Sequence, residues 1–272
     1  MDPKISASLT RALTNLDFRD FLERASPAMG LPGTAPRFDA VREIASALLA
    51  ERGRGRELVR ALGASDREEA RLISAVAFGN LALEEGRREE AMAALQELAG
   101  DSHAVVRAGV IDALKHLFTT DAAATFVDVK PWLDGFLQAH VILEALRDRK
   151  VLTALPRSEP VLEILDTAFA LADNAPRAAD RWQGVRTLRA GLPKQITAFV
   201  GRFPTIFDWL KERAAATRPE TREVIETTLA ELHRASFKKG DVEALRSELA
   251  KSAKAPRDPS RIVHGTRKRS KR

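Results

Sequence analysis

Apolar residues recur at three- and four-residue spacing along nearly the whole chain, and no run of residues alternates with a period of two. This spacing places apolar side chains on one face of a helix, so we expect an all-α protein. Pro131 is expected to split or kink the helix that contains it, and Ser65 with Glu68 predicts a capping box. The expected helices cover residues 5–24, 38–50, 54–62, 66–85, 87–99, 103–118, 121–137, 139–155, 159–173, 176–191, 194–201, 204–216, 218–235 and 241–252.

Six of these helices share a pattern in which a polar residue precedes a small-then-apolar pair by five to seven positions. Helix pairs that repeat every 30 to 47 residues or so are typical of α-solenoids. We expect the leading residue of each helix, when it is a cation, to bond an acid or a carbonyl of the adjoining repeat. The leading residues are Arg42, Arg71, Arg107, His140, Arg186 and Arg222, with gaps of 29, 36, 33, 46 and 36 residues.

One stretch carries a family resemblance. Residues 101–117 have Asp101, Val106-Arg107 and Ala113-Leu114 where the second helix of a HEAT repeat has these residue types, and the stretch before it resembles the first helix. The full pattern covers 87–118, and a weaker version covers 38–235. The resemblance implies a right-handed α-solenoid of about six HEAT-like helix pairs, an armadillo-type superhelix. We expect it to span residues 1–253, with a helical cap and loop over 1–36.

The charge is unevenly distributed. The chain has 44 Lys+Arg and 38 Asp+Glu, a formal net charge of +6. Nine of the basic residues and one acid lie in 251–272, so this segment carries +8 and residues 1–250 carry −2. Residues 254–272 have too few apolar side chains to fold alone, and we expect them to form a disordered basic tail.

Several classes of site have no support in the sequence. The chain has no cysteine, and its five histidines include no pair at metal-binding spacing, so no metal or cofactor is expected. His140 is expected to be structural, and the basic run 52–56 is either an exposed turn or a small phosphate contact. No stretch approaches 18 apolar residues, which predicts no membrane span. A cytoplasmic protein is expected, or a nuclear one in a eukaryotic host.

A cluster of arginines surrounds one tryptophan in the predicted helix 176–191. Such a face can hold phosphates and present an aromatic plane to a base. The alternative is an Arg-rich outer face with Trp182 packed into the core, as expected for Trp132 and Trp209. The candidate nucleic-acid-binding residues are Arg177, Arg181, Trp182, Arg186 and Arg189.

The C-terminal tail adds five cations within seven residues. Mobile cations gain affinity for nucleic acid by releasing its counterions, without sequence preference. The alternatives are a solubilising appendage or a nuclear-import signal. The candidate residues are Arg267, Lys268, Arg269, Lys271 and Arg272.

The chain also resembles the HEAT-like DNA alkylation repair glycosylases in size and in its pairing of Arg with Trp, with the closest local similarity over 184–232. This resemblance implies a catalytic Asp near an inward-facing Trp. The candidate pairs are Trp132 with Asp128 or Asp134, and Trp182 with Asp180. The family's Trp is followed four residues later by Asp, whereas Phe136 and Arg186 occupy those positions here.

Together these features predict a non-catalytic protein that binds the DNA or RNA backbone through the tail and the Arg/Trp helix. Two alternatives stay open: a glycosylase acting on alkylated bases, and a scaffold that binds a protein partner on its concave face. A cationic concave face favours nucleic acid, whereas an acidic and apolar face favours a protein.

Overall fold

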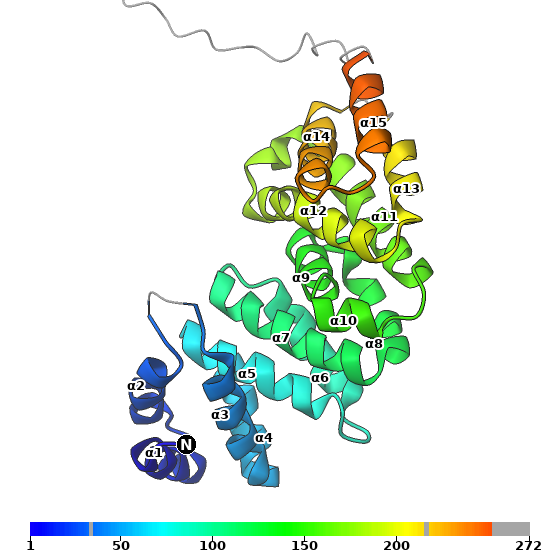
Figure 1. Ribbon diagram of the computed structural model, residues 1–272. Helices are drawn as coiled ribbons and strands as arrows, with labels where there is room; N and C mark the ends of the chain where they lie inside the picture. Colours follow the sequence, from blue (N-terminus) through cyan, green and yellow to red (C-terminus); the bar gives the residue numbers. More distant parts are fainter. Residues whose placement is uncertain (33–34, 215–217, 252–272) are drawn as a thin grey trace, which may run out of the picture.

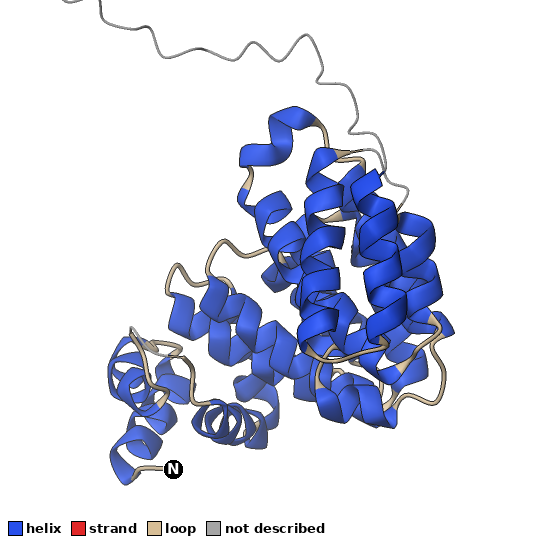
Figure 2. Ribbon diagram, turned by 45° about the horizontal axis from the view of Figure 1, so that its top comes forward, coloured by secondary structure: helices blue, strands red, loops and turns tan. Residues whose placement is uncertain are grey.

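The computed structural model describes residues 1–32, 35–214 and 218–251, and within them all regular structure is helical (Figures 1 and 2). The all-α class is therefore confirmed. The elements are α1 (Pro3–Asn15), α2 (Arg19–Ala28), α3 (Phe38–Ala50), α4 (Arg52–Gly63), α5 (Glu68–Leu81), α6 (Arg88–Ala99), α7 (Ala104–Thr120), α8 (Ala122–Val129), α9 (Phe136–Leu146), α10 (Arg149–Ala154), α11 (Glu159–Asp173), α12 (Gln183–Arg202), α13 (Ile206–Arg213), α14 (Pro219–Arg234) and α15 (Lys239–Lys251), with 3-10 helices η1 (Lys130–Asp134) and η2 (Arg177–Arg181).

The six helices that share the sequence pattern form one continuous row. Helix α3 packs on α5, α5 on α7, α7 on α9, α9 on α12 and α12 on α14. The helices between them in the sequence pack against this row, as α4 and α6 do against α5. Figure 1 shows α1 and α2 at one end of the molecule and α15 at the other. Stacked helix pairs of this kind are consistent with a helical solenoid.

The hydrophobic core is elongated along the row of helices. One connected cluster of buried side chains extends from Ile5 to Leu249. Helix α5 is buried almost all round, and it approaches α7 unusually closely at Gly79. A Cβ added to Gly79 would lie 2.6 Å from the Cβ of Ala113. Glycine is therefore required at this crossing because the two backbones leave no room for a side chain.

Four predicted helices are divided in the structure, and two of them are divided at a capping residue. The predicted helix 5–24 breaks at Leu16, which adopts a left-handed conformation and caps α1 by donating its N–H to Ala12 O at 2.8 Å. The predicted helix 139–155 breaks before α10, where the Asp148 carboxylate accepts the Lys150 N–H at 2.9 Å. As expected, the segment containing Pro131 leaves the α-helix and forms η1.

Three local predictions are wrong. Helix α12 continues through Pro193, where a break was expected, because apolar residues on both sides of the proline, such as Leu192 and Ile196, are fully buried. The capping box is absent: α5 has no side-chain cap, and the Ser65 hydroxyl instead accepts the Arg67 N–H. The basic run 52–56 is not a turn but the start of α4.

Candidate nucleic-acid interface

The predicted Arg/Trp helix is divided into two elements by the tryptophan itself. Trp182 has extended backbone angles and separates η2 from α12, and its N–H donates to Ala179 O at 2.8 Å. Ala179 and Val185 are fully buried in a small apolar cluster that holds the segment down on both sides. The bend between η2 and α12 turns Trp182 outward, while Ala179 and Val185 on either side of it pack inward.

Trp182 is the most exposed aromatic side chain among the described residues, at 57%. The alternative that it packs into the core is therefore wrong. Trp132 and Trp209 are buried as expected, at 2% and 7%. An exposed indole is costly in water unless a partner covers it, so Trp182 is available for stacking.

Two arginines beside Trp182 are unpaired. The side chains of Arg181 and Arg186 are exposed and make no hydrogen bond or ion pair with any residue that the structure describes. Arg177 is exposed at the start of η2. We name the surface formed by Arg177, Arg181, Trp182 and Arg186 the Arg/Trp edge. It combines cations with an open aromatic plane.

Arg189 has a different position from the other predicted arginines. Its Nη1 donates to Asp180 Oδ1 and its Nη2 to Ala172 O, both at 2.8 Å, and its side chain is only 15% exposed. Through these two bonds, Arg189 on α12 connects η2 to the end of α11. Arg189 is thus engaged within the fold, and we leave it out of the Arg/Trp edge.

The Arg/Trp edge is fixed in place by a long-range hydrogen bond. Gln183 Nε2 donates to Ser102 O at 3.0 Å, which joins the start of α12 to the turn before α7. Gly184 lies against α9, where an added Cβ would be 3.0 Å from the Phe136 Cβ. Trp182 is therefore positioned beside the N-terminal end of α7.

Several leading residues of the row hold the fold together, as expected. Arg71 Nε donates to Asp101 Oδ2 at 2.6 Å, and Arg222 donates to Leu249 O on α15. Arg107 donates to Asp101 O and Ser102 O, in the turn before its own helix rather than in a neighbouring repeat. Burial lowers the pKa of Arg107 below its ordinary value.

The Asp101 carboxylate is held as an anion within this network. Burial acts to raise the pKa of Asp101, but hydrogen bonds from Arg71 and from His103 outweigh it, so the pKa lies below its ordinary value. Arg186 is the exception among the leading arginines, since no residue of the described chain pairs with it.

His140 lies between α9 and α12, in agreement with a structural role. Burial lowers its pKa, and the charge of Glu144 opposes this effect while those of Arg107 and Arg147 add to it. Gly191 makes room for the ring, because a Cβ there would lie 2.6 Å from His140 Nδ1.

A groove of about 720 Å³ crosses the row between α3, α5, α7 and α10. Its lining contains four cations, two carboxylates and one histidine: Arg42, Lys115, Arg149, Lys150, Asp112, Asp148 and His116. The groove is therefore cationic. No motif in the sequence pointed to it, because its lining residues come from helices that lie far apart in the sequence.

Both carboxylates of the groove are already paired. Arg42 Nε donates to Asp112 Oδ2 at 3.0 Å across α5, and Lys115 Nζ lies 3.1 Å from Asp148 Oδ2. Burial acts to raise the pKa of Asp148, but the Lys150 N–H and Lys115 outweigh it and leave the pKa below its ordinary value. The unpaired charges of the groove are thus positive.

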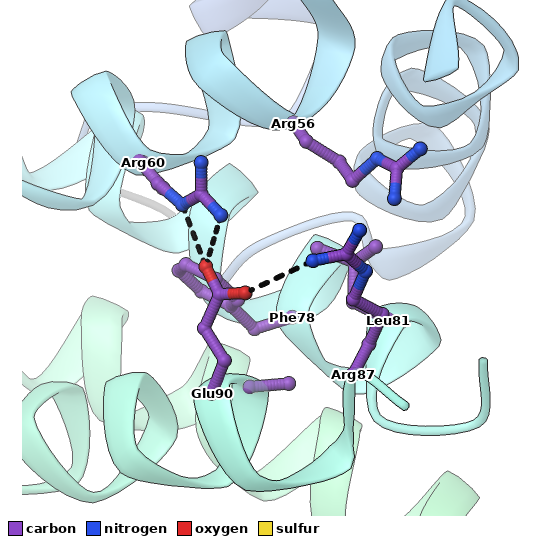
Figure 3. A pocket seen from close by; sticks show the side chains of 7 residues that line it. Arg56, Arg60, Phe78, Leu81, Arg87 and Glu90 are labelled. Carbon is purple, nitrogen blue, oxygen red and sulfur yellow. Dashed lines mark hydrogen bonds and ion pairs between the residues drawn. The ribbon is translucent and has the colours of Figure 1, made fainter. Parts of the chain in front are cut away.

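A smaller hollow on the opposite side of α5 is built around Glu90 (Figure 3). Arg60 Nε donates to Glu90 Oε1 at 2.6 Å, and Arg87 Nη1 lies 3.7 Å from Glu90 Oε2. The bond between Arg60 and Glu90 joins α4 to α6, whereas Arg87 contacts Glu90 within the first turn of α6. The carboxylate occupies the space between the guanidinium groups, so the cluster stabilises helix packing and leaves little room for a ligand.

The aspartates suggested by the glycosylase resemblance are differently placed. Asp128 pairs with Arg88 at 2.6 Å, and Asp180 pairs with Arg189. Asp134 is exposed, but its partner Trp132 is buried and cannot contact a ligand. None of these pairs places a free carboxylate beside an exposed tryptophan.

The tail residues Arg267, Lys268, Arg269, Lys271 and Arg272 lie outside the described residues. Within the described chain, no three His, Asp or Glu side chains are grouped to hold a metal ion. The described helices also include none that is both long and apolar enough to cross a bilayer.

Comparison with known proteins gives no match: no family model, curated protein or solved structure is similar to this chain.

Proposed function

We propose that this protein binds nucleic acid through the Arg/Trp edge, with the basic tail 254–272 capturing the polyanion. The observation that carries the proposal is the exposed Trp182 between two unpaired arginines, Arg181 and Arg186. An aromatic plane stacks on a base while guanidinium groups hold the neighbouring phosphates. This combination is typical of binding without sequence preference.

We further infer that the row of helices is a right-handed, HEAT-like solenoid of about six helix pairs. Such folds present extended surfaces, and the row carries both the Arg/Trp edge and the groove. The cationic lining of the groove favours nucleic acid over the scaffold alternative, for which an acidic and apolar surface was expected.

Trp182 makes the proposal directly testable. Because Trp132 and Trp209 are buried, quenching of tryptophan fluorescence by an added oligonucleotide reports mainly on Trp182. We expect quenching in the full chain, and weaker binding by about 1–3 kcal/mol in Trp182→Ala when affinity is measured with a labelled strand. Trp209→Phe is the matched control and should leave the quenching in place.

The role of the tail is tested by ending the chain at residue 253. Five phosphate contacts correspond to a slope of log affinity against log salt of about −3.5 on a single strand or −4.5 on a duplex. Removing the tail should lower the affinity and reduce this slope. Unchanged affinity, or no binding by the full chain at 50 or 200 mM salt, would overturn the proposed function.

A further inference from the structure

The groove carries two cations that the fold does not use. Arg149 and Lys150 are exposed at the start of α10, and neither side chain has a hydrogen-bond or ion-pair partner in the described part of the chain. Asp112 and Asp148 are neutralised by Arg42 and Lys115. An anion in the groove would therefore meet unpaired positive charge and no free carboxylate.

Uncharged polar side chains complete the lining. Ser46 and Asn80 line the groove from α3 and α5, and their side chains form no hydrogen bond with the described residues. Hydroxyl and amide groups contact phosphate oxygens alongside Arg and Lys in nucleic-acid complexes. The groove thus matches a sugar–phosphate backbone better than a compact apolar ligand.

Helix α7 connects the groove to the Arg/Trp edge. Ser102, just before α7, accepts the hydrogen bond from Gln183, and Lys115 lines the groove further along the same helix. At a rise of 1.5 Å per residue, these two points are about 20 Å apart. A single strand stacked as in a duplex rises 3.4 Å per nucleotide and covers this distance in about six nucleotides.

We propose that the groove and the Arg/Trp edge bind the same single-stranded nucleic acid, one segment at each end of α7. This inference rests on the proposed function and adds the second contact. A single strand is required because Trp182 stacks on a base that is free of its own partner. Two linked contacts bind more tightly than either alone, provided that the strand spans both.

The test compares a 12-nucleotide and a 3-nucleotide oligothymidine by fluorescence anisotropy, using the full chain. The groove variant is Arg149→Gln/Lys150→Gln. The control Lys4→Gln/Lys239→Gln removes the same charge at exposed positions outside the groove and the Arg/Trp edge. Trp182→Ala reports on the edge, and thermal unfolding verifies that all variants fold.

The groove variant should bind the 12-nucleotide strand about 20-fold more weakly at 0.1 M salt, since two phosphate contacts are lost. Its affinity for the 3-nucleotide strand should equal that of the control, whereas Trp182→Ala should weaken binding of both strands. If the groove variant matches the control on the long strand while Trp182→Ala still weakens binding, the groove inference fails and the proposed function stands. If the unaltered chain binds neither strand, the proposed function fails.

Discussion

The start of α5 and the start of α12 occupy equivalent places in the row but use their leading arginine differently. Arg71 and Asp101 pair at 12% and 11% side-chain exposure, and the pair links α5 to the turn before α7. Arg186 is exposed and unpaired within the described chain, beside an exposed tryptophan. The same sequence position thus stabilises the fold at one repeat and is available to a ligand at another. What differs is that an acid in the turn before the next helix of the row pairs with Arg71, whereas no described residue pairs with Arg186.

The largest expected effect is that of Arg71→Ala, which removes one partner of a largely buried ion pair. Asp101 would then lose its main charged partner, and we expect a loss of about 3–5 kcal/mol in the free energy of unfolding. Urea unfolding followed by circular dichroism measures this loss. A loss below about 1 kcal/mol in the free energy of unfolding would show that the pair does not stabilise the fold. Arg71 and Arg186 would then not differ in their contribution to stability.

Gly79→Val should come next, because it forces a branched side chain into the close crossing of α5 and α7. The added Cβ alone would lie 2.6 Å from Ala113 Cβ, so the helices must separate. We expect a loss of about 1–3 kcal/mol in the free energy of unfolding. Gly201→Val is a useful control, since a Cβ at that glycine meets no atom within 4 Å. Equal losses in both variants would contradict the close crossing.

A smaller effect is expected from His140, the one histidine among the leading residues of the row. Its folded-state pKa lies below the unfolded value of about 6.5 because of burial. The unfolded chain therefore binds the proton first, and stability should fall as the pH drops from about 7 through 6.5 to the lower folded-state pKa. Comparing urea unfolding of the unaltered chain and His140→Gln at pH 7 and pH 5 isolates this contribution. A pH dependence that is identical in the two proteins would exclude it.

The smallest effect on stability is expected for Arg186→Ala, which removes an exposed and unpaired side chain. The free energy of unfolding should stay within about 0.5 kcal/mol of the unaltered value. Binding to a single strand should nevertheless weaken about fivefold at 0.1 M salt, with the salt slope reduced by about 0.7. Lys4→Ala provides the matched surface control. Loss of stability without loss of binding would assign Arg186 to the fold.

Helical periodicity located α3 and α7 well, because apolar side chains recur at helical spacing along both helices. The predicted 38–50 coincides with α3, and the predicted 103–118 begins one residue before α7 and ends two residues before it. Local signals were less reliable where packing overrides them. Pro193 favours a helix end because it lacks an N–H, yet α12 continues past it between buried neighbours.

The candidate site was predicted in part, for a physical reason. Clustering in the sequence brings Arg181 and Trp182 together, but it cannot show that Arg189 turns inward to Asp180. The groove was missed because Lys115 and Arg149 come from different helices, and their proximity depends on how α10 packs on α7. A cation is available to a ligand only when it forms no ion pair within the protein, and the ion pairs form only in the folded chain.

The ion pair between Arg42 and Asp112 has a mechanical consequence. It joins α3 to α7, so it links helices that are not neighbours in the row. In a repeat protein each unit contacts only its neighbours, so the row of repeats can bend at every junction between units. An ion pair between helices that are not neighbours resists this bending. We therefore expect the segment from α3 to α7 to be more rigid than the rest of the row, with bending concentrated between α9 and α14.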